Sequence, residues 1–519
     1  MQNGRGWLRP LPNSMKRNRK HYSRPAGSSN AWWEMTSSDG PSQLTLAPAP
    51  VAREGSPDRL DPRVWRVAAV VFLGPFMTQM DSTVVNVSLS TIRQELHSSI
   101  ESAQWIISGY LLALALMLPL NGWLVDRLGA KRLYLGCFSA FTLASLLCGA
   151  AKTMDQLICA RVIQGIAGGL LAPMTQLMLA RVAGKHMARV MGYTAVPILI
   201  APILGPVVAG AILKYAAWPW LFYVNLPVGI LAVALAAFLL PRDEAAFQKR
   251  PFDFLGFLMI SPGLACLLYG LEHVAHRDGV LILLAGLICL GAFVRDAIRK
   301  KHAALIDLRV FNNRVFATAT TTQFLSNGLA YSGQFLVPIY LIAGCGISPA
   351  KAGWMLAPMG LGMMCVYPFM GFLTDRFGCR AVSAAGVLVA LLGTLPFLWM
   401  IQNQFSPTLM VICLLARGAG QGAIGIPSLA AAYSSLRRDK LAVGTTAINI
   451  VQRLGGPMAT TAMAIAMSFS AIYFPVSEPR AFMIPFVVFI GLHLLVLGSA
   501  SRLPVLVHQR DEPNLTTES

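Results

Sequence analysis

The segment GWLVDRLGAKR, residues 122–132, is followed 249 residues later by a close copy, GFLTDRFGCR, residues 371–380. Each copy comes at the end of a long apolar run and combines two glycines with an aspartate and basic residues. Glycine allows a tight turn, an aspartate near a helix end interacts with the helix terminus or with arginine, and basic residues hold a loop on one side of a membrane. A second pair, RVIQG at 161–165 and RGAGQG at 417–422, repeats in the same order. Two repeats at matching positions predict two structurally similar halves.

The apolar runs around these repeats are long enough to cross a membrane. Of the 519 residues, 55% are hydrophobic and only 13% are charged, against about 25% charged in soluble domains. A hydrocarbon core about 30 Å thick needs roughly 20 apolar residues in a helix. We predict fourteen spans, of which the seventh and eighth are weaker. They lie near residues 67–89, 102–124, 133–151, 157–179, 191–213, 221–240, 254–271, 280–294, 317–342, 352–373, 382–401, 409–432, 443–467 and 482–501.

The predicted fold is therefore an all-α integral membrane protein of two six-helix bundles with an inserted helix pair. We expect a disordered cytoplasmic tail at 1–64, the first bundle at 65–241, the inserted pair at 242–311, the second bundle at 312–503 and a second tail at 504–519. Alternate connections between spans hold 20 and 6 Lys and Arg residues. Because basic loops stay in the cytoplasm, both termini are predicted to be cytoplasmic. The net charge of +19 lies in these short loops and the tails, which argues against nucleic-acid binding.

Charged residues inside the spans are the candidates for function. Asp81 is the acidic residue deepest in an apolar run, and a mid-membrane carboxylate costs about 2.5 to 3.5 kcal/mol on insertion scales. It should therefore face a wet cavity or a partner, which makes it the candidate proton carrier; the alternative is a packing aspartate satisfied by Ser82 and Thr83. Arg161 either tunes the protonation of Asp81 or bonds helix carbonyls and Gln164.

The span at 191–213 is unusually rich in proline and small residues. Pro197, Pro202 and Pro206 stand among the small residues Ala201, Gly205, Ala209 and Gly210, which predicts a bent helix packed closely at its small-residue face. The alternative is a generic packing face of small residues.

At this point the chain resembles the major facilitator superfamily, specifically its fourteen-helix drug:H+ antiporter branch. The resemblance covers residues from about 63 to 503 and depends on several motifs besides the repeated loop. These are DSTVVNV at 81–87, Trp105 to Tyr110, Arg161 with Gln164 and Gly165, Gly205-Pro206 with Gly210, and WPWLFYVNLPVG at 218–229. Ser90 and Ile342 depart from the branch's usual proline and glutamine.

The resemblance implies a multidrug efflux antiporter that exports small hydrophobic compounds by alternating access in the bacterial cytoplasmic (inner) membrane. It implies no cofactor, since the proton gradient drives transport, and no metal site. Some members of the branch act with a periplasmic adaptor and an outer-membrane channel. By role, the implied residues are Asp81 and Arg161 for proton coupling; Gly122, Asp126, Arg127, Gly129, Gly371, Asp375, Arg376 and Gly378 for the conformational switch; Pro202, Gly205, Pro206 and Gly210 for the antiporter helix; and Trp105, Tyr110, Gln164, Arg417 and Arg453 for the substrate cavity.

Two other functions stay open, and two further classes are not expected. Proton-coupled uptake of a metabolite is disfavoured by the exporter-like helix at 191–213, and a non-transporting sensor or scaffold would not need Asp81 and Arg161. The sequence contains no GxxxxGK[ST] motif and no converging catalytic residues, so neither ATP-driven transport nor an enzyme is expected.

Overall fold

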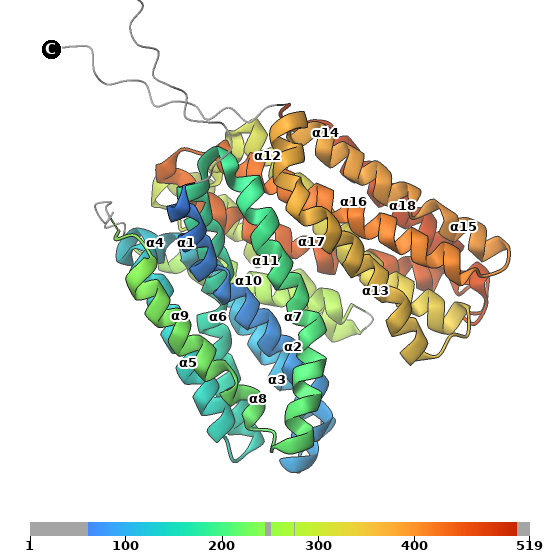
Figure 1. Cartoon of the computed structure of the whole chain (residues 1–519), viewed down its shortest axis with the longest axis horizontal. Helices are drawn as coiled ribbons and strands as arrows, with labels where there is room; N and C mark the ends of the chain where they lie inside the picture. Colours follow the sequence, from blue (N-terminus) through green and yellow to red (C-terminus); the bar gives the residue numbers. More distant parts are fainter. Residues whose placement is uncertain (1–60, 244–250, 275, 506–519) are drawn as a thin grey trace, which may run out of the picture. The chain divides into compact units, whose positions relative to one another are not determined.

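The computed structural model of the chain describes residues 61–243, 251–274 and 276–505 (Figure 1). Within these ranges every regular element is a helix and there is no strand. The apolar composition explains this, because hydrocarbon offers no water to bind peptide groups and a helix satisfies them within one segment. The all-helical prediction is confirmed for the described residues.

The first half of the protein contains six long helical runs that overlap the first six predicted spans. The run nearest the N-terminus begins at Pro62, within the last residues of the predicted tail, and the Asp61 carboxylate caps it by accepting a hydrogen bond from the Arg63 N–H at 2.8 Å. The rest of that tail lies outside the described residues. The helices of this half are α1 (Pro62–Val71), α2 (Leu73–Glu95), α3 (Ile100–Met117), α4 (Asn121–Leu128), α5 (Ala130–Ala150), α6 (Met154–Ala183), α7 (Met187–Tyr215), α8 (Trp220–Tyr223) and α9 (Asn225–Leu239).

The second half repeats the helix pairing of the first. In the first half α2 packs on α7, and both α3 and α5 pack on α6; in the second half α12 packs on α17, and both α13 and α14 pack on α16. Figure 1 shows α13, α14 and α16 running side by side. The helices are α12 (Arg314–Ile339), α13 (Pro349–Val366), α14 (Met370–Leu392), α15 (Leu395–Gln402), α16 (Pro407–Ser434), α17 (Leu441–Ser470) and α18 (Met483–Ala500). The internal repeat of the sequence thus corresponds to an internal repeat of the fold.

A helical hairpin, α10 (Phe254–Glu272) and α11 (Arg277–Lys300), lies between the halves in the sequence. Asp253 caps α10 by accepting from the Gly256 N–H at 3.0 Å, and its carboxylate also binds Lys300 Nζ at 2.7 Å. Burial raises the pKa of Asp253, but these bonds and one from the Leu305 N–H outweigh burial and leave the pKa below its usual value. The base of the hairpin is therefore closed by an ionised aspartate.

The predicted number of fourteen spans is not confirmed. Within the described residues eleven helices are long and apolar enough to cross a membrane. The run Lys351–Gln402 is counted as a single span, although Gly378 within it has non-helical backbone angles. Helices α12 and α17 carry many polar residues and are not counted as spans. Two of the predicted spans thus lack the clear apolar signature of the others, and two more are counted as one run.

The two copies of the repeated loop have the same backbone conformation. Gly129 has φ 84° and ψ 155°, and Gly378 has φ 82° and ψ 161°, a region that favours glycine because it has no Cβ. The basic residue two positions later caps the last helix of its own half. Lys131 Nζ donates to the Ala237 and Leu240 carbonyls at 2.7 Å, and Arg380 Nε donates to the Leu503 carbonyl at 2.6 Å. The repeated glycines and basic residues thus make the same turn twice.

Candidate proton-coupling site and conformational switch

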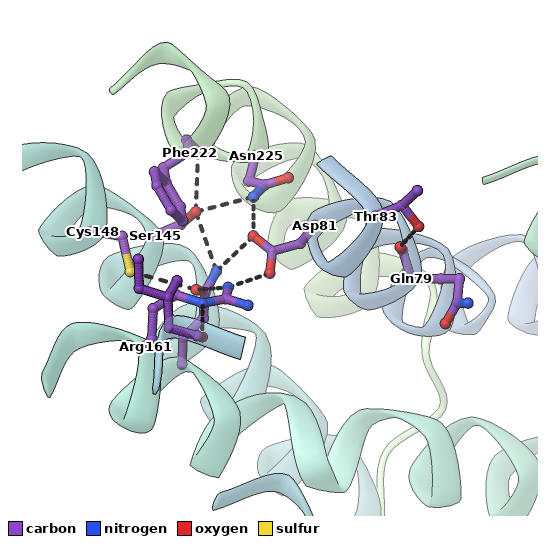
Figure 2. A network of polar contacts seen from close by, with 10 residues as sticks. Gln79, Asp81, Thr83, Ser145, Cys148, Arg161, Phe222 and Asn225 are labelled. Atoms are coloured by element: carbon purple, nitrogen blue, oxygen red, sulfur yellow. Dashed lines mark hydrogen bonds and ion pairs between the residues drawn. The ribbon is translucent and has the colours of Figure 1, made fainter. Parts of the chain in front are cut away.

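Asp81 is buried in the middle of α2 and forms an ion pair. Its side chain is 0% exposed and that of Arg161, on α6, is 1% exposed; Arg161 Nη1 donates to Asp81 Oδ2 at 2.5 Å. Figure 2 shows the carboxylate facing Arg161 on one side and Asn225 on the other. The sequence left open whether Asp81 faces a cavity or partner, or is satisfied by its neighbours Ser82 and Thr83. In the structure a charged partner, Arg161, lies beside it. Thr83 does not satisfy the carboxylate, because its hydroxyl donates to the Gln79 carbonyl at 2.8 Å.

Two side-chain amides complete the surroundings of the carboxylate. Gln164 Nε2 and Asn225 Nδ2 both donate to Asp81 Oδ1, at 3.1 and 2.9 Å. The same two nitrogens also donate to the Ser145 hydroxyl, at 3.3 and 3.1 Å, and that hydroxyl donates to the Phe222 carbonyl at 3.0 Å (Figure 2). All these side chains are buried. Four elements, α2, α5, α6 and the start of α9, therefore meet at one carboxylate.

Arg161 is held in position by contacts beyond the ion pair. Its Nη1 donates to Gln164 Oε1 at 2.7 Å and its Nε donates to the Ile106 carbonyl at 3.3 Å. The Tyr110 ring lies against the guanidinium, with the ring centroid 4.1 Å from Cζ, a cation–π arrangement. Both sequence interpretations of Arg161 thus describe real contacts: it pairs with Asp81 and it also bonds a carbonyl and Gln164.

The network is complementary to an ionised Asp81. The groups that contact its oxygens, a guanidinium and two amide nitrogens, are all hydrogen-bond donors, and a protonated carboxyl would also need an acceptor. Removing one partner of a buried ion pair typically costs about 3 to 5 kcal/mol, because the other charge is left uncompensated. Protonation of Asp81 removes such a charge. Protonation would therefore weaken the contacts that join these four elements at the carboxylate.

The two copies of the repeated loop each pack on the opposite half of the protein. A Cβ on Gly122 would lie 3.2 Å from Thr446 Oγ1 of α17, and a Cβ on Gly371 would lie 2.2 Å from the Cα of Arg189 on α7. Asp375 also pairs with Arg189, whose Nη2 lies 3.2 Å from the carboxylate. Gly122 and Gly371, two of the four predicted switch glycines, are therefore interface residues.

Other members of the predicted switch lie at the same interface or on the surface beside it. Asp126 lies near Arg181 of α6, within range of electrostatic attraction. Arg127 and Arg376 occupy equivalent exposed positions, each over an aromatic ring of its own loop, Trp123 at 5.2 Å and Phe377 at 5.5 Å. The pairing of each arginine with a ring is a further likeness between the two copies.

A polar cluster joins the halves beside these loops. Gln176 Oε1 of α6 accepts from the Tyr433 hydroxyl of α16 at 2.9 Å and from Asn449 Nδ2 of α17 at 2.7 Å. Asn121 Nδ2 of α4 donates to Thr446 Oγ1 at 3.4 Å. The two halves are therefore in contact on the side of the basic loops.

The role predicted for the antiporter helix stays a prediction, and the structure shows which residues of this helix are buried. Ala201, Gly205 and Ala209, spaced by four, form the buried face of α7, and a Cβ on Gly205 would lie 2.6 Å from Thr83 Cγ2 of α2. Pro202, Pro206 and Gly210 are exposed, and nothing lies within 4 Å of a Cβ on Gly210. The reason is geometric: a period of four keeps 201, 205 and 209 on one helix face and turns their neighbours away from it.

The residues predicted for the substrate cavity do not form one cluster. Tyr110 and Gln164 belong to the buried network around Asp81, and Trp105 is 48% exposed. Arg417 is buried in the second half, 4.8 Å from the Phe489 ring, and Arg453 is partly exposed on α17. Among the described residues nothing accepts a hydrogen bond from Nε or Nη1 of Arg417. Their role in binding substrate stays a prediction.

Sequence reasoning missed Ser145 and Asn225 as site residues. Asn225 stands inside the WPWLFYVNLPVG motif, and Ser145 is one of three hydroxyl residues, with Ser139 and Thr142, in an apolar stretch. A polar residue in an apolar span was the available signal, but many other hydroxyls in these helices share it.

Comparison with known proteins agrees with this architecture. The sequence profile described as Major Facilitator Superfamily matches residues 71–460, and the chain belongs to this family of membrane transporters. A Mycobacterium tuberculosis protein named "Multidrug resistance protein B homolog" is 37% identical over 453 residues, covering 85% of this chain and 83% of that protein. A Pectobacterium atrosepticum protein named "Putative multidrug resistance protein MdtD" is 35% identical over 352 residues, covering 65% and 74%.

Solved structures of low sequence identity share the fold. A double tryptophan mutant of XylE superposes with a TM-score of 0.61 at 13% identity, covering 86% of this chain and 97% of that one. The human organic anion transporter MFSD10 superposes with a TM-score of 0.57 at 17% identity, covering 85% and 100%. At such identities the likeness concerns the fold alone.

Proposed function

We propose that this protein exports small hydrophobic compounds across the bacterial cytoplasmic membrane in exchange for protons, by alternating access of a site between its two halves. The observation that carries the proposal is the buried ion pair of Asp81 and Arg161. An intramembrane ionisable pair is expensive to bury and marks a proton or ion pathway in transporters. The names of the relatives, both multidrug resistance proteins, support drugs as the cargo.

The proposed orientation has both termini in the cytoplasm, as the distribution of basic loops predicts. In that orientation the contacts among Gly122, Gly371, Gln176 and their partners close the cytoplasmic side. Entry of a proton at Asp81 would break its network and favour the alternative conformation, in which the cytoplasmic side opens to substrate. The cycle uses no cofactor besides the proton gradient. Cooperation with a periplasmic adaptor and an outer-membrane channel stays a separate prediction.

Accumulation of dye in cells that express the chain tests the proposal. The dyes are lipophilic fluorophores that are neutral, anionic or monocationic, and accumulation is followed before and after nigericin and valinomycin collapse the gradients. Cells with the wild-type chain should hold less dye than cells with Asp81→Asn at equal membrane abundance, and the difference should vanish with the gradients. Equal accumulation for every dye would refute export, and export that survives the ionophores would refute proton coupling.

A further inference from the structure

The amide of Asn225 has only one orientation that fits its surroundings. The side chain lies at the first position of α9 and is buried. Its Nδ2 has two hydrogens, which point to Asp81 Oδ1 at 2.9 Å and to Ser145 Oγ at 3.1 Å. Because the Ser145 hydroxyl donates its single hydrogen to the Phe222 carbonyl, its oxygen can only accept a hydrogen bond from Asn225. The nitrogen of the amide must therefore face the carboxylate.

Asn225 and Gln164 are the neutral donors to the Asp81 carboxylate, and Asn225 is the closer of the two. The charged or titratable groups around the carboxylate are Arg161 of α6, Tyr110 of α3 and Cys148 of α5, with Arg453 of α17 beyond Tyr110. Helix α7 faces α2 with the apolar contact of Gly205 against Thr83, and its charged residues lie toward its ends. From α9 the facing group is Asn225, which is neutral and only donates.

We infer that Asn225 is a positioning residue that holds Asp81 as the carboxylate, with Ser145 fixing the direction of the amide, and so sets the pH at which Asp81 takes up its proton. This inference deepens the proposed function, since it assigns a residue to the proton site of the exporter. It depends on the described contacts and not on the identity of the cargo.

The test is an infrared titration of the purified full chain, in which the C=O stretch of a protonated carboxyl is followed against pH. The spectrum of Asp81→Asn is subtracted, so the remaining signal belongs to Asp81. In Asn225→Leu, which keeps the approximate volume, the carboxylate loses one donor. A hydrogen bond to a charged group of about 1.5 to 3 kcal/mol corresponds to a midpoint about 1 to 2 pH units higher than in the wild type.

Two further variants keep the test decisive. Ser145→Ala leaves Asn225 in place but frees its amide, so the midpoint should rise by a smaller amount. Asn86→Leu, at an exposed asparagine on the same helix as Asp81, is the matched control and should leave the midpoint unchanged. If Asn225→Leu does not fold, Ser145→Ala decides.

The outcomes separate this inference from the proposed function. Unchanged midpoints in folded Asn225→Leu and Ser145→Ala would overturn the inference, as would an equal rise in Asn86→Leu. A shifted midpoint in a protein that exports none of the dyes would refute the proposed function and leave the assignment of Asn225 standing.

Discussion

Gly371→Ala should weaken the contact between the two halves at the repeated loops, which closes the cytoplasmic side in the proposed orientation. A Cβ at this position would lie 2.2 Å from the Cα of Arg189, whereas ordinary contact begins at 3.4 Å. The neighbouring atom belongs to the backbone of α7, so a rotamer change cannot relieve the clash and the helices must separate by roughly 1.2 Å. Overpacking of this kind costs about 1 to 3 kcal/mol. Because the contact crosses the interface, the cost should fall on the closed conformation and shift the equilibrium roughly 5- to 150-fold toward opening.

Spin-label distances measure this shift directly. Leu128 and Phe377 are exposed, equivalent residues of the two repeated loops, 42% and 52% accessible, and each can carry a label in a background without other cysteines. Gly371→Ala should increase the fraction of the longer distance. Gly136→Ala is the matched control, since nothing lies within 4 Å of its Cβ. An unchanged distance distribution in a folded Gly371→Ala protein would refute the assignment of this glycine to the closed interface.

Four further predictions concern the proton site, the switch, the topology and the cargo. Asp81→Asn should abolish gradient-coupled efflux at normal membrane abundance, because an amide cannot release a proton, while Asp81→Glu should keep part of it; coupled efflux by the Asn variant would place coupling elsewhere. Gly122→Leu and Asp126→Asn should lower transport, measured in vesicles, more than substrate binding, because they disturb switching; equal losses would indicate misfolding. Reporter fusions after Ser519 and near His273 should give cytoplasmic and external signals, and an external C-terminus would contradict the predicted topology. Dications should be poor substrates in efflux assays matched for lipophilicity, since Asp81, the acidic residue deepest in an apolar run, is already paired with Arg161; their preferential export would contradict this.

The parts of the fold that depend on local sequence could be predicted. Apolar runs of about 20 residues predict membrane helices, whichever other helices they pack against. The repeated loop was recognisable because a turn with positive φ needs glycine, and Gly129 and Gly378 both adopt such a turn. The number of spans was harder to predict, because helices such as α12 and α17 carry enough polar residues to lose the apolar signature.

The parts of the site that depend on helix rotation and on distant contacts could not be predicted. Asp81 and Arg161 stood out because a charge in an apolar span is rare, but the sequence did not decide between pairing and carbonyl bonding for Arg161. Ser145 and Asn225 join the network from two other helices, and nothing local indicates which face of each helix points to Asp81. The same limit applies to Gly210, which the sequence grouped with the small-residue face of α7 and which is exposed.

The α10–α11 hairpin is fastened to both halves of the protein by side-chain hydrogen bonds. Ser261 of α10 donates to the Leu116 carbonyl of the first half at 2.9 Å, and Thr461 of α17 donates to the Leu271 carbonyl of α10 at 3.1 Å. Because the hairpin is bonded to both halves, it limits how far the halves can move relative to each other unless one of these hydrogen bonds breaks. Each connection is one neutral hydrogen bond, worth about 0.5 to 1.5 kcal/mol. We therefore expect one of these bonds to break and re-form in each transport cycle. In the proposed alternating-access cycle, the inserted helices would thus limit the relative movement of the two halves.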